Sequence, residues 1–276
     1  MLKPYWRYTN LRLIKRLYLK RFKQATLIKK LFFIVFITLT LGIHAQRSQF
    51  SVIRDKPVLT LEARIAQYYD FEQPSDSLNP VEYDHLKAIS RGLRYDFSAL
   101  IHLGDYFEIG PTFSGLQTSN TIENINVLVV TPQGDTLSLR GNLEDRINQN
   151  FFGVRLDSRI SIGEYMFLRP GISVGYLLYS NKTDAAGYKY ELKGNTLGVD
   201  IHASLQYKAD DNWGVMLAAS IMPSFIYEPT LEYENGGSLV YTGGLLNVGH
   251  YHIGVGLSYT FTKPDKDKMP QYFKVP

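Results

Sequence analysis

The sequence predicts an all-β protein, an eight-stranded antiparallel up-and-down transmembrane β-barrel. Three observations predict it: eight segments alternate apolar and polar residues, short and long connectors take turns between them, and a secretory signal pattern precedes them. The clearest segment runs from Tyr251 to Phe261, where six large apolar side chains share one face and small or polar residues share the other. A strand of about ten residues with one such apolar face is long enough to cross a bilayer.

The N-terminus has the order of a secretory signal. Residues 1–30 contain ten Lys or Arg and no acid, the apolar run from Leu31 to Ile43 follows, and Ala45 and Gln46 flank the predicted cleavage site. That run is shorter than the roughly 20 residues of a spanning helix, and an uncleaved anchor or a start codon placed too early are the alternatives. Cleavage would leave 20 basic and 26 acidic residues, so the mature chain is not expected to bind nucleic acid.

The eight predicted strands follow in order after a short periplasmic lead-in over residues 46–56. They cover residues 57–70, 88–103, 106–119, 149–161, 166–180, 194–208, 212–227 and 247–261. No stretch between 57 and 261 shows a convincing helical period. The barrel domain is therefore predicted over residues 57–261.

The connectors predict which end of each strand faces which side of the membrane. Those after the second, fourth and sixth strands are tight and turn-forming. Those after the first, third, fifth and seventh are long and polar, over residues 71–87, 120–148, 181–193 and 228–246. Outer-membrane barrels have short periplasmic turns and long extracellular loops in this alternation. An even strand number also places both termini in the periplasm, where residues 262–276 are predicted to form a flexible tail.

The third connector contains a hairpin signal of its own. Asn126 to Thr131 and Thr136 to Arg140 flank a Pro-Gln-Gly-Asp turn sequence. We therefore expect the third and fourth strands to extend beyond the membrane.

Alternation assigns one apolar and one charged face to the strands. The apolar face carries aromatic residues near both strand ends. This is expected for a membrane strand, because aromatic residues are enriched at both membrane–water interfaces. The other face holds five arginines and five acids, and these ten are the predicted lumen charge network: Glu62, Arg64, Arg94, Asp96, Glu108, Arg155, Asp157, Arg159, Arg169 and Asp200. The equal numbers predict mutual pairing, because the guanidinium fork matches a carboxylate.

Two alternatives to a packed, salt-bridged lumen stay open at this point. The lumen could hold a narrow ion path or a gated pocket, although an eight-stranded barrel is only wide enough for its own side chains. The faces could also be reversed, as in a soluble lipocalin-like barrel with an apolar cavity. Glycines on the charged face, such as Gly254 and Gly256, favour the membrane assignment because small residues suit a crowded lumen.

The sequence predicts no catalytic, metal-binding or cofactor-binding residues. The absence of cysteine excludes disulfides, thiolate metal sites, cysteine nucleophiles and lipoprotein anchoring. His250 and His252 share a face on one strand, as Asp200 and His202 do on another, and we expect both pairs to fill the lumen near strand ends. The apolar face offers hardly a serine or histidine, and no glycine-framed serine motif appears. These absences argue against a lipid-modifying enzyme, which is kept as an alternative function. A small-solute channel is the other alternative.

The signal ending in Ala45-Gln46, the eight segments and the terminal strand Leu257 to Phe261 carry a family resemblance. The chain resembles the outer membrane protein beta-barrel domain family common in Bacteroidetes, which includes PorT-like proteins, and OmpA-type eight-stranded barrels. The resemblance implies a monomer in the bacterial outer membrane whose partners are lipid and, during biogenesis, the barrel insertion machinery. PorT-like members are associated with a secretion apparatus. For this chain we expect a non-catalytic role in envelope structure or interaction, through the surface loops or the periplasmic tail and with a periplasmic or surface protein partner.

Overall fold

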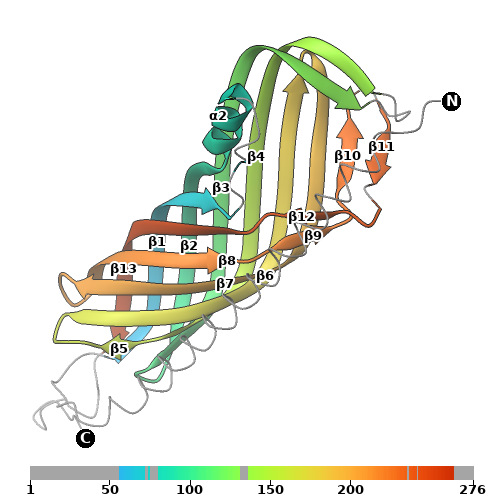
Figure 1. Ribbon diagram of the computed structural model, residues 1–276. Helices are drawn as coiled ribbons and strands as arrows, with labels where there is room; N and C mark the ends of the chain where they lie inside the picture. Colours follow the sequence, from blue (N-terminus) through green and yellow to red (C-terminus); the bar gives the residue numbers. More distant parts are fainter. Residues whose placement is uncertain are drawn as a thin grey trace, which may run out of the picture. The chain divides into compact units, whose positions relative to one another are not determined.

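Eight long strands pair edge to edge and close into a barrel (Figure 1). The computed structural model describes residues 56–71, 74, 80–130, 136–234, 236–240 and 242–263. The eight strands are β1 (Lys56–Asp70), β2 (Arg91–Leu103), β3 (Phe107–Val130), β4 (Thr136–Ser158), β6 (Met166–Ala185), β7 (Tyr188–Lys208), β8 (Trp213–Met222) and β13 (His250–Lys263). The signal with Ala45 and Gln46, the lead-in up to residue 55 and the tail from residue 264 lie outside the described residues.

Closure comes from the first and last strands. β13 pairs with β1 along its length, from His250 opposite Asp70 to Lys263 opposite Lys56, and with β8 on its other side. All neighbouring pairs in the ring are antiparallel. The predicted eight-stranded antiparallel barrel is therefore confirmed. Among the described residues, no helix is long and apolar enough to span a bilayer.

One end of the barrel carries three of the tight turns. They follow β2, β7 and the pair β4 and β5 (Ile160–Ser161), and the described chain ends, Lys56 and Lys263, lie at the same end. In the turn after β7, the backbone N–H groups of Trp213 and Asn212 donate to Asp210 Oδ1 at 2.6 and 2.8 Å. These two hydrogen bonds lower the pKa of the Asp210 carboxyl because they favour its charged form.

The hairpin predicted within the third connector is confirmed, because β3 and β4 stay paired beyond residue 120. As loops, the predicted segments 120–148 and 181–193 are wrong because they are mostly paired strand. β3 and β4 remain in register up to Val130 opposite Thr136, with one irregularity between Ile122 and Ile125, so most of 120–148 is hairpin. β6 and β7 meet at the two-residue turn Ala186–Gly187, and most of 181–193 is also hairpin. The polar composition of these segments marks the point where the strands leave the membrane, because both faces of a strand can then be polar.

The first predicted loop contains a helix, α2 (Pro80–Ile89), which the sequence analysis did not predict. It starts at proline, which suits the first turn of a helix, and carries Glu82 in the first turn and Lys87 in the last. Only His85 and Ile89 of the helix are buried. Two buried positions in ten residues give too weak a period to detect.

Four of the strands are about twice as long as a membrane requires. β3, β4, β6 and β7 have 20 to 24 residues, whereas β1, β2, β8 and β13 have 10 to 15. About ten residues are enough to cross the bilayer. The long strands therefore continue beyond the loop end of the barrel as an open curved sheet, visible in the upper part of Figure 1.

We call this extension the half-shell. It comprises residues 120–130 of β3, 136–147 of β4, 180–185 of β6 and 188–195 of β7, with β10 (Thr230–Tyr233) and β11 (Ser238–Val240) added beside β7. The hairpin of β9 (Phe225–Tyr227) and β12 (Leu245–Asn247) lies in the connector from β8 to β13. The predicted loop 228–246 is thus partly strand as well.

Replacing Val255 with arginine tests which face of β13 meets lipid. Val255 on β13 is 54% exposed. Val240 on β11, in the half-shell, is 50% exposed, and the same substitution at this position is the matched control. We expect Val255→Arg to lower the free energy of unfolding in lipid vesicles by about 2–4 kcal/mol, because arginine is costly near the bilayer midplane. Val240→Arg should cost less than about 1 kcal/mol. Urea titration of the refolded proteins measures both, and equal costs would show that the outward assignment is wrong.

Candidate functional site

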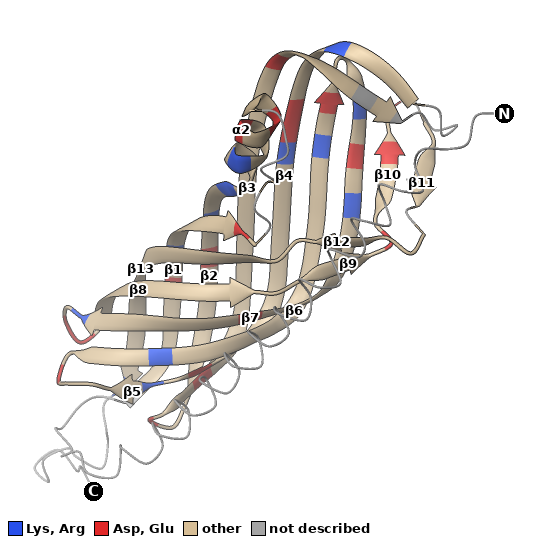
Figure 2. Ribbon diagram, in the orientation of Figure 1, with Lys and Arg blue, Asp and Glu red and all other residues tan. Residues whose placement is uncertain are grey.

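The exterior of the barrel is an apolar band. Large apolar side chains on the outward face of seven of the eight ring strands are exposed, and on β3 they are half-buried. The exposed ones include Leu61, Ile65, Leu93, Phe97, Ile101, Phe152, Val154, Leu156, Val174, Leu178, Leu197, Leu205, Val215, Leu217, Ile253, Val255 and Leu257. Aromatic side chains meet on this exterior, as between Phe113 and Phe152 with ring centroids 4.9 Å apart. Charged residues of β4, β6 and β7 are instead frequent on the half-shell (Figure 2). The apolar band is the kind of surface that lies against lipid, whereas the charged half-shell is not.

The ten predicted lumen residues all lie on the opposite, inward face. Nine of them are buried. Arg159 is half-buried, and its guanidinium lies 4.0 Å from the centroid of the Phe167 ring. Two glycines let these large side chains fit. A Cβ at Gly171 would lie 2.2 Å from Asp157 Oδ1, and one at Gly256 would lie 2.5 Å from Arg64 Cγ.

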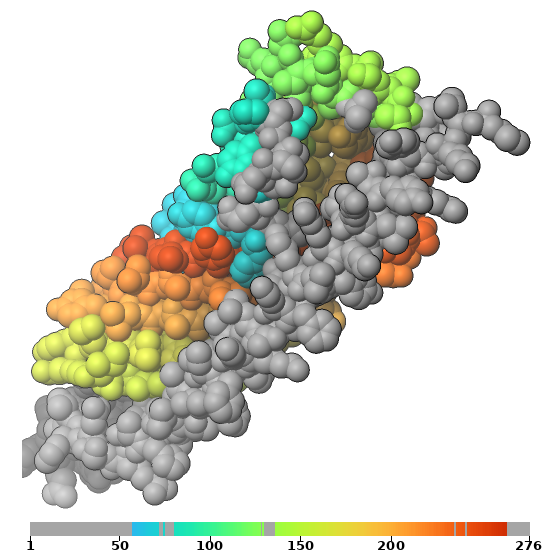
Figure 3. All heavy atoms as spheres, viewed as in Figure 1, coloured from blue at the N-terminus to red at the C-terminus, as the bar shows by residue number. Residues whose placement is uncertain are grey.

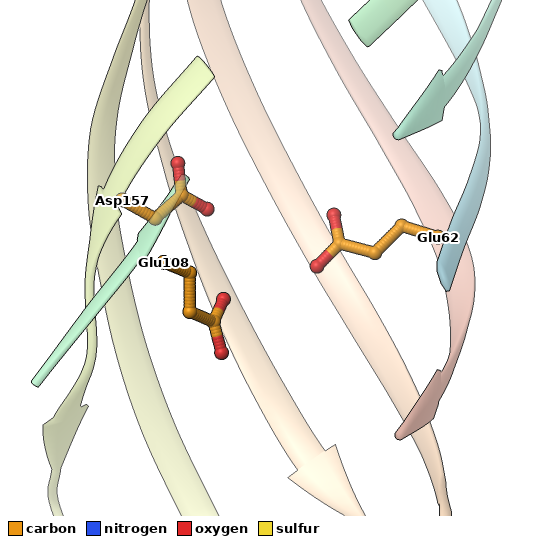
Figure 4. Close-up of side chains that lie close together, drawn as sticks. All are labelled: Glu62, Glu108 and Asp157. Atoms are coloured by element: carbon orange, nitrogen blue, oxygen red, sulfur yellow. The ribbon is translucent and has the colours of Figure 1, made fainter. Parts of the chain in front are cut away.

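Arg155 and Arg169 form the centre of the first cluster in the lumen. Arg155 donates to both oxygens of Asp157, at 2.8 and 2.5 Å, and to Glu62 at 2.8 Å. Arg169 donates to Glu62 and Glu108, and to Asp157 at 3.2 Å. Figure 4 shows Glu62 reaching from β1 toward Glu108 of β3 and Asp157 of β4. Strands β1, β3, β4 and β6 are therefore tied together across the lumen.

The three carboxylates of this cluster have the spacing of a metal site. Ligand oxygens of Glu62, Glu108 and Asp157 all lie within 4.8 Å of one another. Each carboxylate already accepts hydrogen bonds from a guanidinium, and Asp157 also bonds His202 Nε2 at 2.8 Å. The arginines therefore supply the positive charge that a cation would bring, and the donor set fits an ion-pair cluster better than a metal centre.

Arg94 forms the centre of a second cluster, nearer the half-shell. Its guanidinium donates to Asp96 and Asp200, both at 2.8 Å, and to Ser114 at 2.9 Å. His250 Nε2 lies 2.7 Å from Arg94 Nη1. Every nitrogen of this buried guanidinium thus has a partner.

Arg64 lies between the clusters and is bound less completely. Its Nε lies 3.7 Å from Asp96 Oδ2, and neither Nε nor Nη1 makes a hydrogen bond. The buried arginines of the lumen therefore differ in how completely their donors are used.

The lumen histidines are part of the same clusters. His102 lies 3.2 Å from Glu108 and 2.8 Å from Thr60. Ser220 Oγ donates to Asp200 and lies 3.3 Å from His252 Nδ1. Ser220 therefore joins Asp200 and His252, and the sequence analysis missed this serine, although Ser220 shares their inward face by alternation.

This serine does not have the geometry of a nucleophile. In a catalytic triad the acid orients the histidine, which in turn takes the proton of the serine. Here Asp200 accepts from the serine itself, and Ser220 is buried in the lumen. The contact therefore fills the lumen with satisfied polar groups.

An apolar cluster closes the lumen at the half-shell end. Its buried members are Phe151, Leu177, Tyr179, Met222, Ile226 and Val248. Along β4 the inward positions run from Asp157 and Arg155 past Gly153 to Phe151, so this apolar layer follows directly on the charged clusters. The described interior is thus filled by ion pairs and then covered by apolar side chains.

Beyond the apolar cluster, α2 is fastened to the inner face of the half-shell. His85 Nε2 lies 2.8 Å from Asp145 Oδ2, and Thr183 donates to Asp145 Oδ1 at 2.5 Å. Asn120 Nδ2 lies 2.9 Å from His85 Nδ1. The sequence analysis missed this group because it assigned all four residues to loops.

Several solved structures of bacterial outer-membrane proteins are similar in fold to this chain. The outer membrane protease OmpT from Escherichia coli is 12% identical, with 74% of this chain and 94% of that chain covered and a TM-score of 0.43. The attachment invasion locus protein Ail from Yersinia pestis is 14% identical, with 75% and 99% covered and a TM-score of 0.41. The outer membrane protein OprG from Pseudomonas aeruginosa is 8% identical, with 76% and 98% covered and a TM-score of 0.48.

No family model matches the chain, and no curated protein matches it. The fold assignment therefore rests on the strand pairing of the chain itself. A closed barrel satisfies its backbone hydrogen bonds internally and can cross lipid, and the apolar exterior requires lipid around it. This protein is therefore a transmembrane β-barrel, with the architecture of outer-membrane barrels.

Replacing Arg155 with methionine tests the importance of the lumen ion pairs. We expect Arg155→Met to lower the free energy of unfolding by about 3–5 kcal/mol, because the buried carboxylates of Glu62 and Asp157 lose one of their two arginine partners. The matched control is Arg146→Met, since the side chain of Arg146 is 63% exposed and its pairing with Glu144 should contribute less than about 1 kcal/mol. Equilibrium unfolding in vesicles measures both variants, and similar costs would contradict a lumen held by ion pairs.

Proposed function

We propose that this protein is a non-catalytic outer-membrane barrel with a closed lumen, acting in envelope structure or interaction through its half-shell. The observation that carries the proposal is the filling of the interior. The ion-pair clusters around Arg155 and Arg94 and the apolar cluster around Phe151 follow one another along the barrel. These layers fill the interior formed by the described residues, which supports a closed lumen, so the role is assigned to the surfaces outside the membrane.

The half-shell offers a charged outer face for such a role. Four basic and five acidic residues share it: Arg146, Lys182, Lys189, Lys193, Glu144, Asp184, Glu191, Glu232 and Glu234. All of them except Lys193 line a trough of about 570 Å³. Exposed pairs such as Lys193 with Glu232, at 2.7 Å, contribute little to stability and can exchange partners. This mixed charge supports contact with a polar or charged partner.

We also propose that the chain is related to the Bacteroidetes-type barrel family that includes PorT-like proteins. The order of the N-terminal signal and the terminal strand ending in Phe261 support this. The absence of a catalytic role is supported by the interior position of Ser220 and by the arginine partners of the described carboxylate cluster.

Conductance measurements test the closed lumen. We expect the protein reconstituted in planar bilayers to show no unitary current steps, because the described interior has no continuous aqueous path. A general diffusion porin reconstituted in the same way provides the positive control. Regular steps that vanish when the barrel is unfolded would contradict the proposal and favour a channel.

Photo-crosslinking in intact envelopes tests the role of the half-shell. A photoreactive residue in place of Lys189 lies on the outer face, and the same residue in place of Val255 lies on the lipid face and is the matched control. We expect protein adducts only from position 189. Equal labelling from the two positions would argue against an interaction surface on the half-shell.

A further inference from the structure

The half-shell ends on one side in an unpaired strand edge. β2 pairs with β3 only as far as Leu93 opposite Gln117, whereas β3 continues to Val130. Beyond the contact of α2 with Asn120, no described strand pairs with β3 on the side away from β4. We call residues 121–130 of β3 the open edge. The hairpin that contains it forms the green tip at the top of Figure 3.

The backbone of the open edge offers hydrogen-bonding groups to a further strand. In an edge strand, every second residue turns its N–H and C=O groups away from its only neighbour. Within the described part of the chain, the backbone of residues 121–130 forms backbone hydrogen bonds with β4 alone. The open edge is thus a row of donors and acceptors at strand spacing, to which another polypeptide strand can add.

The open edge lacks the features that protect other sheet edges. Such edges are protected by short length, charged residues, proline or irregular pairing. β11, at the opposite edge of the half-shell, has only three residues. Ile125 to Val130 is a regular six-residue stretch without charge or proline, and four of the six residues are β-branched. An exposed edge of this composition is prone to aggregate, which favours a partner strand that covers it.

Two features of the open edge select the side chains of the partner. Val127 lies opposite Leu139 and Val129 opposite Leu137, so an apolar strip crosses the hairpin as far as the edge. An added strand extends this strip if every second side chain is apolar. At the start of the open edge, Glu123 is exposed and forms no ion pair with any described residue. A basic residue opposite Glu123 would complement its charge.

We propose that the open edge binds an extended segment of another protein, with apolar residues at alternate positions and a basic residue opposite Glu123. A second copy of this chain fits less well. Both copies enter the membrane from the same side, so β3 has the same direction in each, and their edges would pair in parallel, the less stable arrangement. This inference rests on the proposed function, because it names the partner class of the same half-shell.

A fluorescently labelled synthetic peptide tests the proposal. The peptide has eight residues, alternates threonine and valine, and ends in lysine, so that antiparallel pairing with β3 places the lysine opposite Glu123. Fluorescence anisotropy on the full chain in lipid nanodiscs, with empty nanodiscs as the blank, measures binding. N-methylation of the peptide amides should weaken binding by about tenfold or more, because backbone hydrogen bonds to the edge are lost. No binding of the lysine peptide, or equal binding of its N-methylated form, would overturn the proposal.

Two lysine variants locate the peptide on the molecule. Val127→Lys places a charge on the edge strand itself and should weaken peptide binding by about tenfold or more, because charges on an edge oppose strand addition. Leu139→Lys is the matched control and should leave binding unchanged. Leu139 lies opposite Val127 on the same face and is likewise half-buried, but it belongs to β4. Equal loss of binding in both variants would show that the peptide binds the sheet face and would overturn the proposal.

A charge exchange at Glu123 tests the basic residue of the partner. We expect the lysine peptide to bind the natural chain about two- to fivefold more tightly than the same peptide ending in glutamate. Glu123→Lys should reverse this order, because the like and opposite charges exchange places. An unchanged order would overturn the proposed chemistry of the partner.

Heat-modified migration on gels verifies that each variant is folded. Asn126→Cys tests for a second copy, because the natural chain has no cysteine. Disulfide-linked dimers in intact envelopes would show that the open edge pairs with itself and would overturn its assignment to another protein. The crosslinking from position 189 separates these results from the proposed function. If crosslinks persist while the lysine peptide does not bind, only the open-edge proposal is wrong, and if both fail, the half-shell has no interaction role.

Discussion

Pairing of arginine with carboxylate across the lumen is the interaction on which the rest of this structure depends. The outside of the barrel faces lipid, so the ring cannot gain stability by burying apolar residues inside in the usual way. Arg155, Arg169 and Arg94 instead bind acids from several strands at once. Buried ion pairs of this kind repay their desolvation only when nearly every donor and acceptor is used. The strand register is thereby tied to the positions of a few charged side chains.

The sequence was sufficient to predict the ring because membrane strands follow one rule. Each residue faces either lipid or lumen, so alternation put Val255 and Arg155 on opposite faces, and the glycines on the charged face indicated that it lines the lumen. The rule ends where the strand leaves the bilayer. Lys182 and Glu191 face water on the outer side of paired strands, and their polarity suggested a loop. The sheet pairing that orders them depends on neighbours far along the chain.

The half-shell residues illustrate what local pattern cannot show. His85, Asn120, Asp145 and Thr183 come from a helix and three strands and meet only through tertiary packing. The open edge of β3 likewise becomes apparent only when the end of its pairing with β2 is known. For the lumen, by contrast, equal numbers of arginines and acids on one face already predicted pairing, but the choice of partners followed from the curvature of the ring.

The partners in the lumen are far apart along the chain, and this has a consequence for how the protein folds. Arg155 and Glu62 are 93 residues apart, and Arg94 and Asp200 are 106 apart. A hairpin formed early would hold only the pairs within a strand, Arg155 with Asp157 and Arg94 with Asp96, and would lack the cross-lumen partners Glu62 and Asp200. Partly inserted intermediates should be disfavoured, so strand assembly and passage into the membrane have to occur as one cooperative step. Such long-range contacts also predict slow folding. Strand assembly in the membrane is therefore a slow step that a folding catalyst could accelerate.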